Sequence, residues 1–70
     1  MTRAELLRLI RVGARRAGVH MELVRQGSAH ELWSVGDVVI PIPRHRELTS
    51  GVERSIKRDL ERVLGSGWWQ

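Results

Sequence analysis

Near the start of the chain, hydrophobic residues recur every three or four positions among polar ones. This spacing predicts a helix over residues 2–17, with an apolar face formed by Leu6, Leu9, Ile10, Ala14 and Ala17. Thr2 followed by Glu5 is the pattern of a capping box, and Gly18 is a natural stop. Gly13 weakens a helix interior, so we expect it to mark a close approach to another element.

In the middle of the chain, hydrophobic and polar residues alternate, which is the period of a β-strand. Three strands are predicted, over residues 19–25, 29–35 and 38–43. The first break is the Gly27-Ser28 corner, and the second is a hairpin turn centred on Gly36-Asp37.

The third strand carries Pro41 and Pro43, which have no N–H to donate to a ladder, so it should lie at a sheet edge or end early. Trp33 should face the opposite side of the sheet from Leu32, where it is either half-buried against a helix or stacked on a partner. The residues expected in the core from this part of the chain are Met21, Leu23 and Leu32.

Helical spacing returns over residues 50–64, on an apolar stripe of Val52, Ile56, Leu60, Val63 and Leu64. Ser50 with Glu53 predicts a second capping box, and Gly65 should end the helix. Residues 65–70 read as a C-terminal tail outside a single domain of residues 1–64. The tail is either flexible or docked through its two tryptophans, on the core or on a partner.

The element order is therefore helix, three antiparallel strands, helix. Two helices with apolar stripes need one sheet face to cover, which predicts an α+β fold built as a two-layer sandwich. A chain of 70 residues supports one such domain with a modest core.

The charge is the next distinguishing feature: the net charge is +4, carried by arginines and one lysine. Arginine binds phosphate through two parallel hydrogen bonds, so the composition favours nucleic acid or an acidic partner, although a basic surface that is merely solvated stays an alternative. The absence of cysteine excludes disulfides and thiol chemistry. No signal peptide or membrane span is recognisable, and we expect a cytoplasmic protein.

The strongest candidate for chemistry is His30, which follows the Gly27-Ser28 corner at the start of a strand. Histidine titrates near neutral pH and can take the 2′-hydroxyl proton of RNA, which lets that oxygen attack the neighbouring phosphorus without a metal. Backbone N–H groups at Gly27 and the hydroxyl of Ser28 can hold the phosphate. The alternative is a histidine that merely packs at a strand end.

Charged residues near this corner in the sequence complete the candidate site. Arg25, Arg44 and Arg46 can bind phosphate and stabilise negative charge in a transition state. His45 is either a phosphate contact or general acid, or a loop histidine held by Glu47. Three histidines this far apart are a poor metal site, so no metal or other cofactor is expected. The arginines of the first helix form either a phosphate-binding stripe or, as is more usual, a solvated face.

Taken together, "GSAH", the apolar strand after it, the tight turn, "VVIPIPRHREL" and the capped last helix resemble the HicA toxins of bacterial toxin–antitoxin systems. The resemblance implies a fold like the double-stranded-RNA-binding domain and an endoribonuclease that cleaves mRNA with one essential histidine. It also implies silencing by a HicB-like antitoxin in a hetero-oligomer. By position, the catalytic histidine is His30, the glycine corner is Gly27 and Ser28, and the recurring Pro-Arg-His motif is Pro43 to His45.

Two other functions stay open. The first is a non-catalytic RNA-binding module of the same fold, which recognises RNA by shape and phosphate contacts through Arg54, Lys57 and Arg58. The second is a subunit whose role is partner assembly, with Trp68 and Trp69 as contact anchors.

Overall fold

In the computed structural model, which describes all 70 residues, the first helix, α1, spans Arg3–Ala17. The predicted capping box is confirmed: the Thr2 hydroxyl accepts from the Glu5 N–H at 3.1 Å, and the Glu5 carboxylate accepts from the Thr2 N–H at 2.9 Å. Gly18 ends the helix in the left-handed conformation, with φ of 71°. The sequence therefore specifies both ends of α1 locally.

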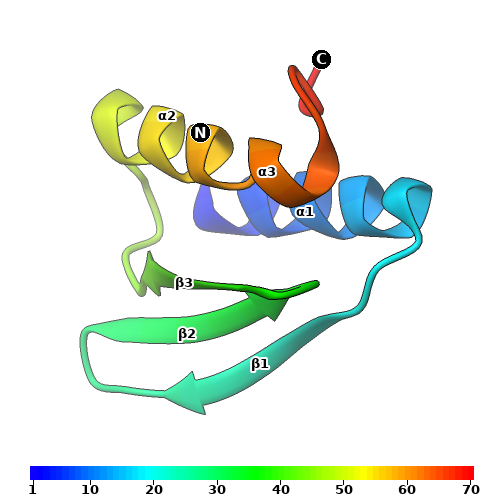
Figure 1. The fold of residues 1–70 in the computed structure, drawn as a ribbon. Coiled ribbons are helices and arrows are strands. Elements are labelled where there is room, and N and C mark those ends of the chain that lie inside the picture. Colours follow the sequence, from blue (N-terminus) through cyan, green and yellow to red (C-terminus); the bar gives the residue numbers. More distant parts are fainter.

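The three strands are β1 (Met21–Gln26), β2 (His30–Val35) and β3 (Val38–Pro43). They form one antiparallel sheet in the order β1-β2-β3, so β3 is an edge strand, as its prolines predict (Figure 1). The β2–β3 hairpin turns at Gly36, whose φ is 60°. The β1–β2 register shifts between Leu23 and Arg25, which is a bulge that breaks the alternation of β1.

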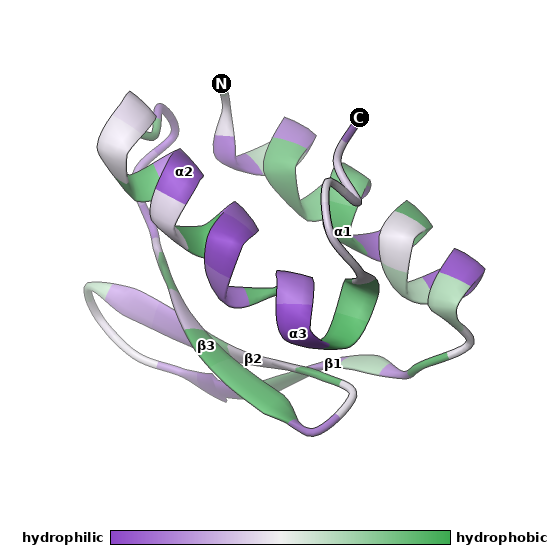
Figure 2. Ribbon diagram, turned by 45° about the horizontal axis from the view of Figure 1, so that its top comes forward, coloured by the Kyte–Doolittle hydropathy of each residue, from purple (hydrophilic) through white to green (hydrophobic).

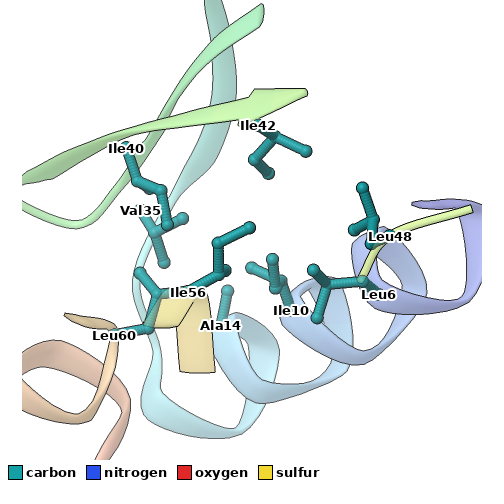
Figure 3. Close-up of a cluster of buried hydrophobic side chains, with 9 residues drawn as sticks. All are labelled: Leu6, Ile10, Ala14, Val35, Ile40, Ile42, Leu48, Ile56 and Leu60. Atoms are coloured by element: carbon teal, nitrogen blue, oxygen red, sulfur yellow. The ribbon is translucent and has the colours of Figure 1, made fainter. Parts of the chain in front are cut away.

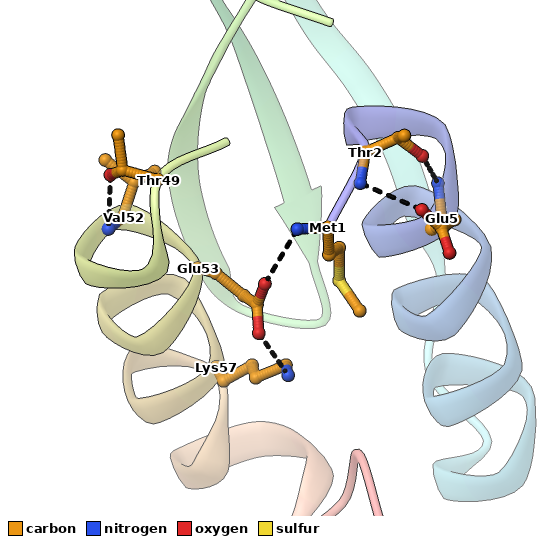
Figure 4. A network of polar contacts seen from close by, with 7 residues as sticks. All are labelled: Met1, Thr2, Glu5, Thr49, Val52, Glu53 and Lys57. Carbon is orange, nitrogen blue, oxygen red and sulfur yellow. Dashed lines mark hydrogen bonds and ion pairs between the residues drawn. The ribbon is translucent and has the colours of Figure 1, made fainter. Parts of the chain in front are cut away.

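The predicted C-terminal helix is two helices, α2 (Ser50–Asp59) and α3 (Glu61–Leu64), separated at the buried Leu60. The predicted cap at Ser50 is wrong by one residue. Thr49 has the extended backbone that a cap requires, and its hydroxyl accepts from the Val52 N–H at 3.2 Å (Figure 4).

The carboxylate of Glu53 joins α2 to the start of the chain (Figure 4). It accepts from Lys57 Nζ at 2.9 Å and lies 3.4 Å from the α-ammonium group of Met1. The hydrogen bond from Lys57, with a further one from that ammonium group, lowers the pKa of Glu53. Hydrogen bonds from Thr2, first from its backbone, likewise lower the pKa of Glu5.

The helices cover one face of the sheet, which gives the predicted two-layer α+β arrangement (Figures 1 and 2). Between the layers lies a core of nine buried side chains: Leu6, Ile10, Ala14, Val35, Ile40, Ile42, Leu48, Ile56 and Leu60 (Figure 3). The core placement of Leu23 is wrong, since 44% of the residue is exposed, and Leu32 is not among the core residues. Met21 and Trp33 are partly buried against the core.

Residues at the C-terminus pack back on α1. The Trp68 ring lies against Gly13: a Cβ atom at that position would be 3.0 Å from Trp68 Cε3 and 3.2 Å from Leu64 Cδ1. The Trp68 Nε1 donates to the Lys57 carbonyl at 2.8 Å. The close approach predicted at Gly13 is thus confirmed, and the second element is the C-terminal turn.

Candidate functional site at the His30 corner

His30 is the first residue of β2, and its side chain is exposed. It pairs with Pro43 of β3, whereas the next residue, Glu31, pairs with Ile42 of the core. Because successive side chains of a strand point to opposite faces, His30 lies on the face that the helices leave open. The imidazole is therefore accessible to a macromolecular ligand.

The corner before His30 is held by two kinds of contact. The Gly27 N–H donates to the His30 carbonyl at 2.9 Å, and a Cβ atom at Gly27 would lie only 2.8 Å from that oxygen. Arg44 then binds the corner twice: its backbone N–H donates to the Ala29 carbonyl at 3.0 Å, and its Nη1 donates to the Gly27 carbonyl at 2.8 Å. The corner is thus fixed by glycine and by an arginine of the segment that follows β3.

These contacts define which groups at the corner are free. The Gly27 N–H is used inside the turn, so it does not add to an anion-binding site. The backbone N–H groups of Ser28 and Ala29 donate to no other backbone group. Ser28 therefore supplies both a free amide and a hydroxyl beside His30.

A surface hollow of about 340 Å3 brings His30 together with Arg25, Gly27 and Ser28. Arg25 is exposed and forms no ion pair, so its guanidinium is free to bind an anion. The hollow thus combines one imidazole, one guanidinium and the donors of Ser28. His30 also lines a second hollow of about 170 Å3 at the edge of β3, which it shares with Ser55 and Asp59 of α2.

The remaining residues of the predicted site lie apart from this hollow. His45 and Arg46 are exposed in the segment between β3 and α2 and do not line it. His45 makes no hydrogen bond or ion pair with Glu47, whose backbone instead bridges to Thr2. The Arg46 carbonyl accepts from the Arg3 N–H at 2.8 Å, which anchors this segment to the start of α1. His20 is exposed, as the strand pattern suggests.

The sequence reasoning missed Glu31, a buried carboxylate directly beside the candidate catalyst, of which only 8% is exposed. It pairs with the Arg3 guanidinium and accepts from Trp33 Nε1 at 3.1 Å. Arg3 Nε in turn donates to the Pro43 carbonyl at 3.0 Å. The signal was present in the alternation, because Glu31 shares its strand face with Trp33 and Val35.

Comparisons with models of known families, with characterised proteins and with solved structures gave no match to this chain. No helix of the structure is both long enough and apolar enough to span a lipid bilayer. No three side chains of His, Asp or Glu gather in an arrangement that would hold a metal ion. The residues of the corner and their geometry are therefore the basis on which a function can be assigned.

Proposed function

We propose that this protein is an endoribonuclease of the HicA type, a toxin that cleaves mRNA with His30 as the general base. The observation that carries the proposal is the position of an exposed histidine on a fixed corner, in one hollow with the free guanidinium of Arg25 and the donors of Ser28. The sequence resemblance supports it, as does the helix, three-stranded sheet and helix order expected of a fold like the double-stranded-RNA-binding domain.

In this mechanism the phosphate whose P–O5′ bond is broken binds Arg25 and the Ser28 donors. The imidazole of His30 takes the 2′-hydroxyl proton, and the 2′-oxygen attacks the phosphorus. The P–O5′ bond breaks, which leaves a 2′,3′-cyclic phosphate on one product, and the leaving 5′-oxygen takes a proton from water to become the 5′-hydroxyl of the other. Arg25 stabilises the negative charge that develops on the phosphoryl oxygens.

Arg44 acts differently from the other arginines of the site. Its Nη1 donates to the Gly27 carbonyl, so Arg44 positions the corner, while its positive charge and its other N–H donors stay available to a phosphate. Arg46 and His45, which lie outside the hollow, would contact RNA that extends beyond the cleavage point. An acidic HicB-like antitoxin in a hetero-oligomer would neutralise these exposed basic groups and cover His30, and the toxin and its mRNA substrate would meet in the cytoplasm.

The test compares His30→Ala with His20→Ala, which removes another exposed histidine of the sheet region outside the hollow. General base catalysis contributes on the order of 100-fold or more, so His30→Ala should lose at least that much cleavage rate, with unchanged circular dichroism. His20→Ala should cleave normally and leave 2′,3′-cyclic phosphate ends. Equal cleavage by the two variants would assign the chemistry to another group, and no cleavage by the parent chain would reject the ribonuclease.

The non-catalytic RNA-binding module stays the second candidate, because Arg54 and Arg58 of α2 are exposed and unpaired. Lys57, the third cation of that group, is engaged by Glu53. This alternative predicts that the parent chain binds RNA without cutting it. His30→Ala would then change neither affinity nor RNA integrity.

A further inference from the structure

The C-terminal turn lies on the side of the helices that faces away from the sheet (Figure 1). Trp68 fixes it there through its contact with Gly13 and its hydrogen bond to the Lys57 carbonyl. Trp69 packs edge-on against Trp68, with ring centroids 5.7 Å apart and planes at 87°. The position of the Trp69 ring is therefore set by its neighbour, while Trp69 itself stays partly exposed.

Trp69 lines two surface hollows at once. One, of about 480 Å3, has Arg8 and Arg16 of α1 in its wall. The other, of about 500 Å3, has Arg54 and Arg58 of α2 in its wall. An indole ring thus lies between two pairs of arginines that come from different helices. We call this region the Trp69 surface.

The charges on this surface favour an anionic ligand. None of its four arginines forms an ion pair. Three carboxylates face the hollows: Glu53 is paired with Lys57 and the α-ammonium group, whereas Glu5 and Glu61 accept only backbone N–H bonds and keep their negative charge. The four arginines outnumber these two. The Lys57 ammonium lies over the Trp69 ring, 5.8 Å from its centroid, but it is paired with Glu53, so the positive charge offered to an anion comes from the four arginines.

We propose that the Trp69 surface binds single-stranded RNA, with a base stacked on Trp69 and phosphates held by the flanking arginines. An aromatic platform inside a basic groove is how proteins hold single strands, because every base offers a π-face and every linkage a charge. Arg8 and Arg16 are separated by about 12 Å along the helix axis, so they contact different phosphates of a polymer and not one small anion. The choice of RNA as the polymer rests on the function proposed above.

This surface is separate from the His30 corner, since the helical layer lies between the C-terminal turn and the sheet (Figure 1). The Trp69 surface would therefore retain a strand whose remaining length passes around the domain to the corner. It adds affinity for long substrates and takes no part in the bond cleavage. Short oligonucleotides should gain less from it than long ones.

The decisive experiment measures binding of a fluorescein-labelled 2′-O-methyl oligouridine, which has no 2′-hydroxyl and stays intact whether or not the protein is a ribonuclease. The double variant Arg8→Gln/Arg16→Gln is compared with Arg11→Gln/Arg15→Gln. Both pairs are exposed arginines of α1 and both lose two charges, but the second pair lines a different hollow with His20. The first variant should bind about tenfold more weakly than the second, with a shallower salt dependence.

A second variant, Trp69→Leu, removes the stacking ring and keeps all charges. Its affinity should fall by about tenfold, and stacking quench of tryptophan fluorescence should fall with it. Equal losses in the two arginine variants would show that only net charge matters, and would overturn the proposal. An unchanged affinity in Trp69→Leu would overturn it as well. Polyglutamate serves as a second probe: if the variants lose affinity for polyglutamate alone and not for oligouridine, the proposal is overturned and the partner is an acidic protein.

The two proposals fail independently. If the parent chain does not cleave RNA but Arg8→Gln/Arg16→Gln and Trp69→Leu both lose oligouridine binding, the Trp69 surface stands without the ribonuclease. If His30→Ala abolishes cleavage while those variants bind like the parent chain, the ribonuclease stands and the Trp69 surface fails.

Discussion

The two edge strands of the sheet have the same length and pair with the same central strand, yet they differ sharply in burial. One row of paired residues shows the difference: Leu23 of β1, Trp33 of β2 and Ile40 of β3 lie side by side on the face that turns towards the helices. Leu23 is 44% exposed, Trp33 is half-buried and Ile40 is 2% exposed. Burial therefore increases from β1 to β3 along a single row.

This difference in burial arises because the helical layer does not extend over the whole sheet. Its short helices cover β3 and the adjoining part of β2, while β1 extends away from them (Figure 1). The core takes Ile40 and Ile42 from β3 and Val35 from β2 but no residue of β1. In a domain this small, an alternating pattern identifies a strand and its two faces, but the neighbouring layer decides which strand is buried.

The largest loss of stability should come from truncating Ile40, at the buried end of this row, and truncating Leu23, at the exposed end, should cost much less. Ile40→Ala leaves a cavity in the core and should lower the free energy of unfolding by roughly 2–5 kcal/mol. Leu23→Ala removes a side chain that already contacts water, and should cost less than about 1 kcal/mol. Urea denaturation followed by circular dichroism measures both. Similar losses would mean that β1 is covered in solution.

A smaller effect should come from the cap of the helix that lies beside β3. Thr49→Ala removes the acceptor for the Val52 N–H and should cost about 1 kcal/mol. Ser50→Ala is the matched control, since its hydroxyl accepts no capping bond, and should be nearly neutral. Thermal melts give the difference. A larger loss from Ser50→Ala would restore the cap position that the sequence suggested.

The smallest effect concerns acid. Because the pKa of Glu53 is lowered in the folded protein, the stability it contributes is present above its ordinary value of 4.5 and is lost as pH falls through the lowered value. Glu53→Gln should therefore flatten the decline of stability below pH 4.5. The control is Glu22→Gln in β1, a residue with no side-chain hydrogen bond or ion pair. Parallel pH profiles for Glu53→Gln and the parent chain would contradict the role given to this contact.

Local signals in the sequence were sufficient for most of the fold. Thr2 with Glu5, Gly18, and the prolines of β3 each act within a few residues, and each prediction based on them is confirmed. The cap at Ser50 was misplaced because Thr49 and Ser50 carry the same hydroxyl chemistry, and only the backbone angles distinguish them. The break at Leu60 and the exposure of Leu23 depend on tertiary packing, which a pattern along the chain does not contain.

The candidate site was predictable to a different degree. His30 and the Gly27-Ser28 corner are adjacent in sequence, and Arg25 lies within the preceding strand, so the residues of the hollow could be named in advance. The bond from Arg44 to the Gly27 carbonyl joins positions 17 residues apart and uses a backbone acceptor, which leaves no mark in the pattern. Gly13 correctly predicted a close contact, but its partner, Trp68, could be identified only from the structure.

The buried carboxylate of Glu31 has a consequence for how mutations in this protein should be interpreted. Glu31, whose side chain pairs with Arg3 and so holds β2 in place, directly follows His30, whose side chain faces the open surface. A substitution at Glu31 or Arg3 would move the His30 backbone without removing any group that touches a ligand. An assay of the proposed ribonuclease activity would therefore show losses at these two positions as it would at His30, and folding measurements on the purified variants would distinguish positioning residues from catalytic ones.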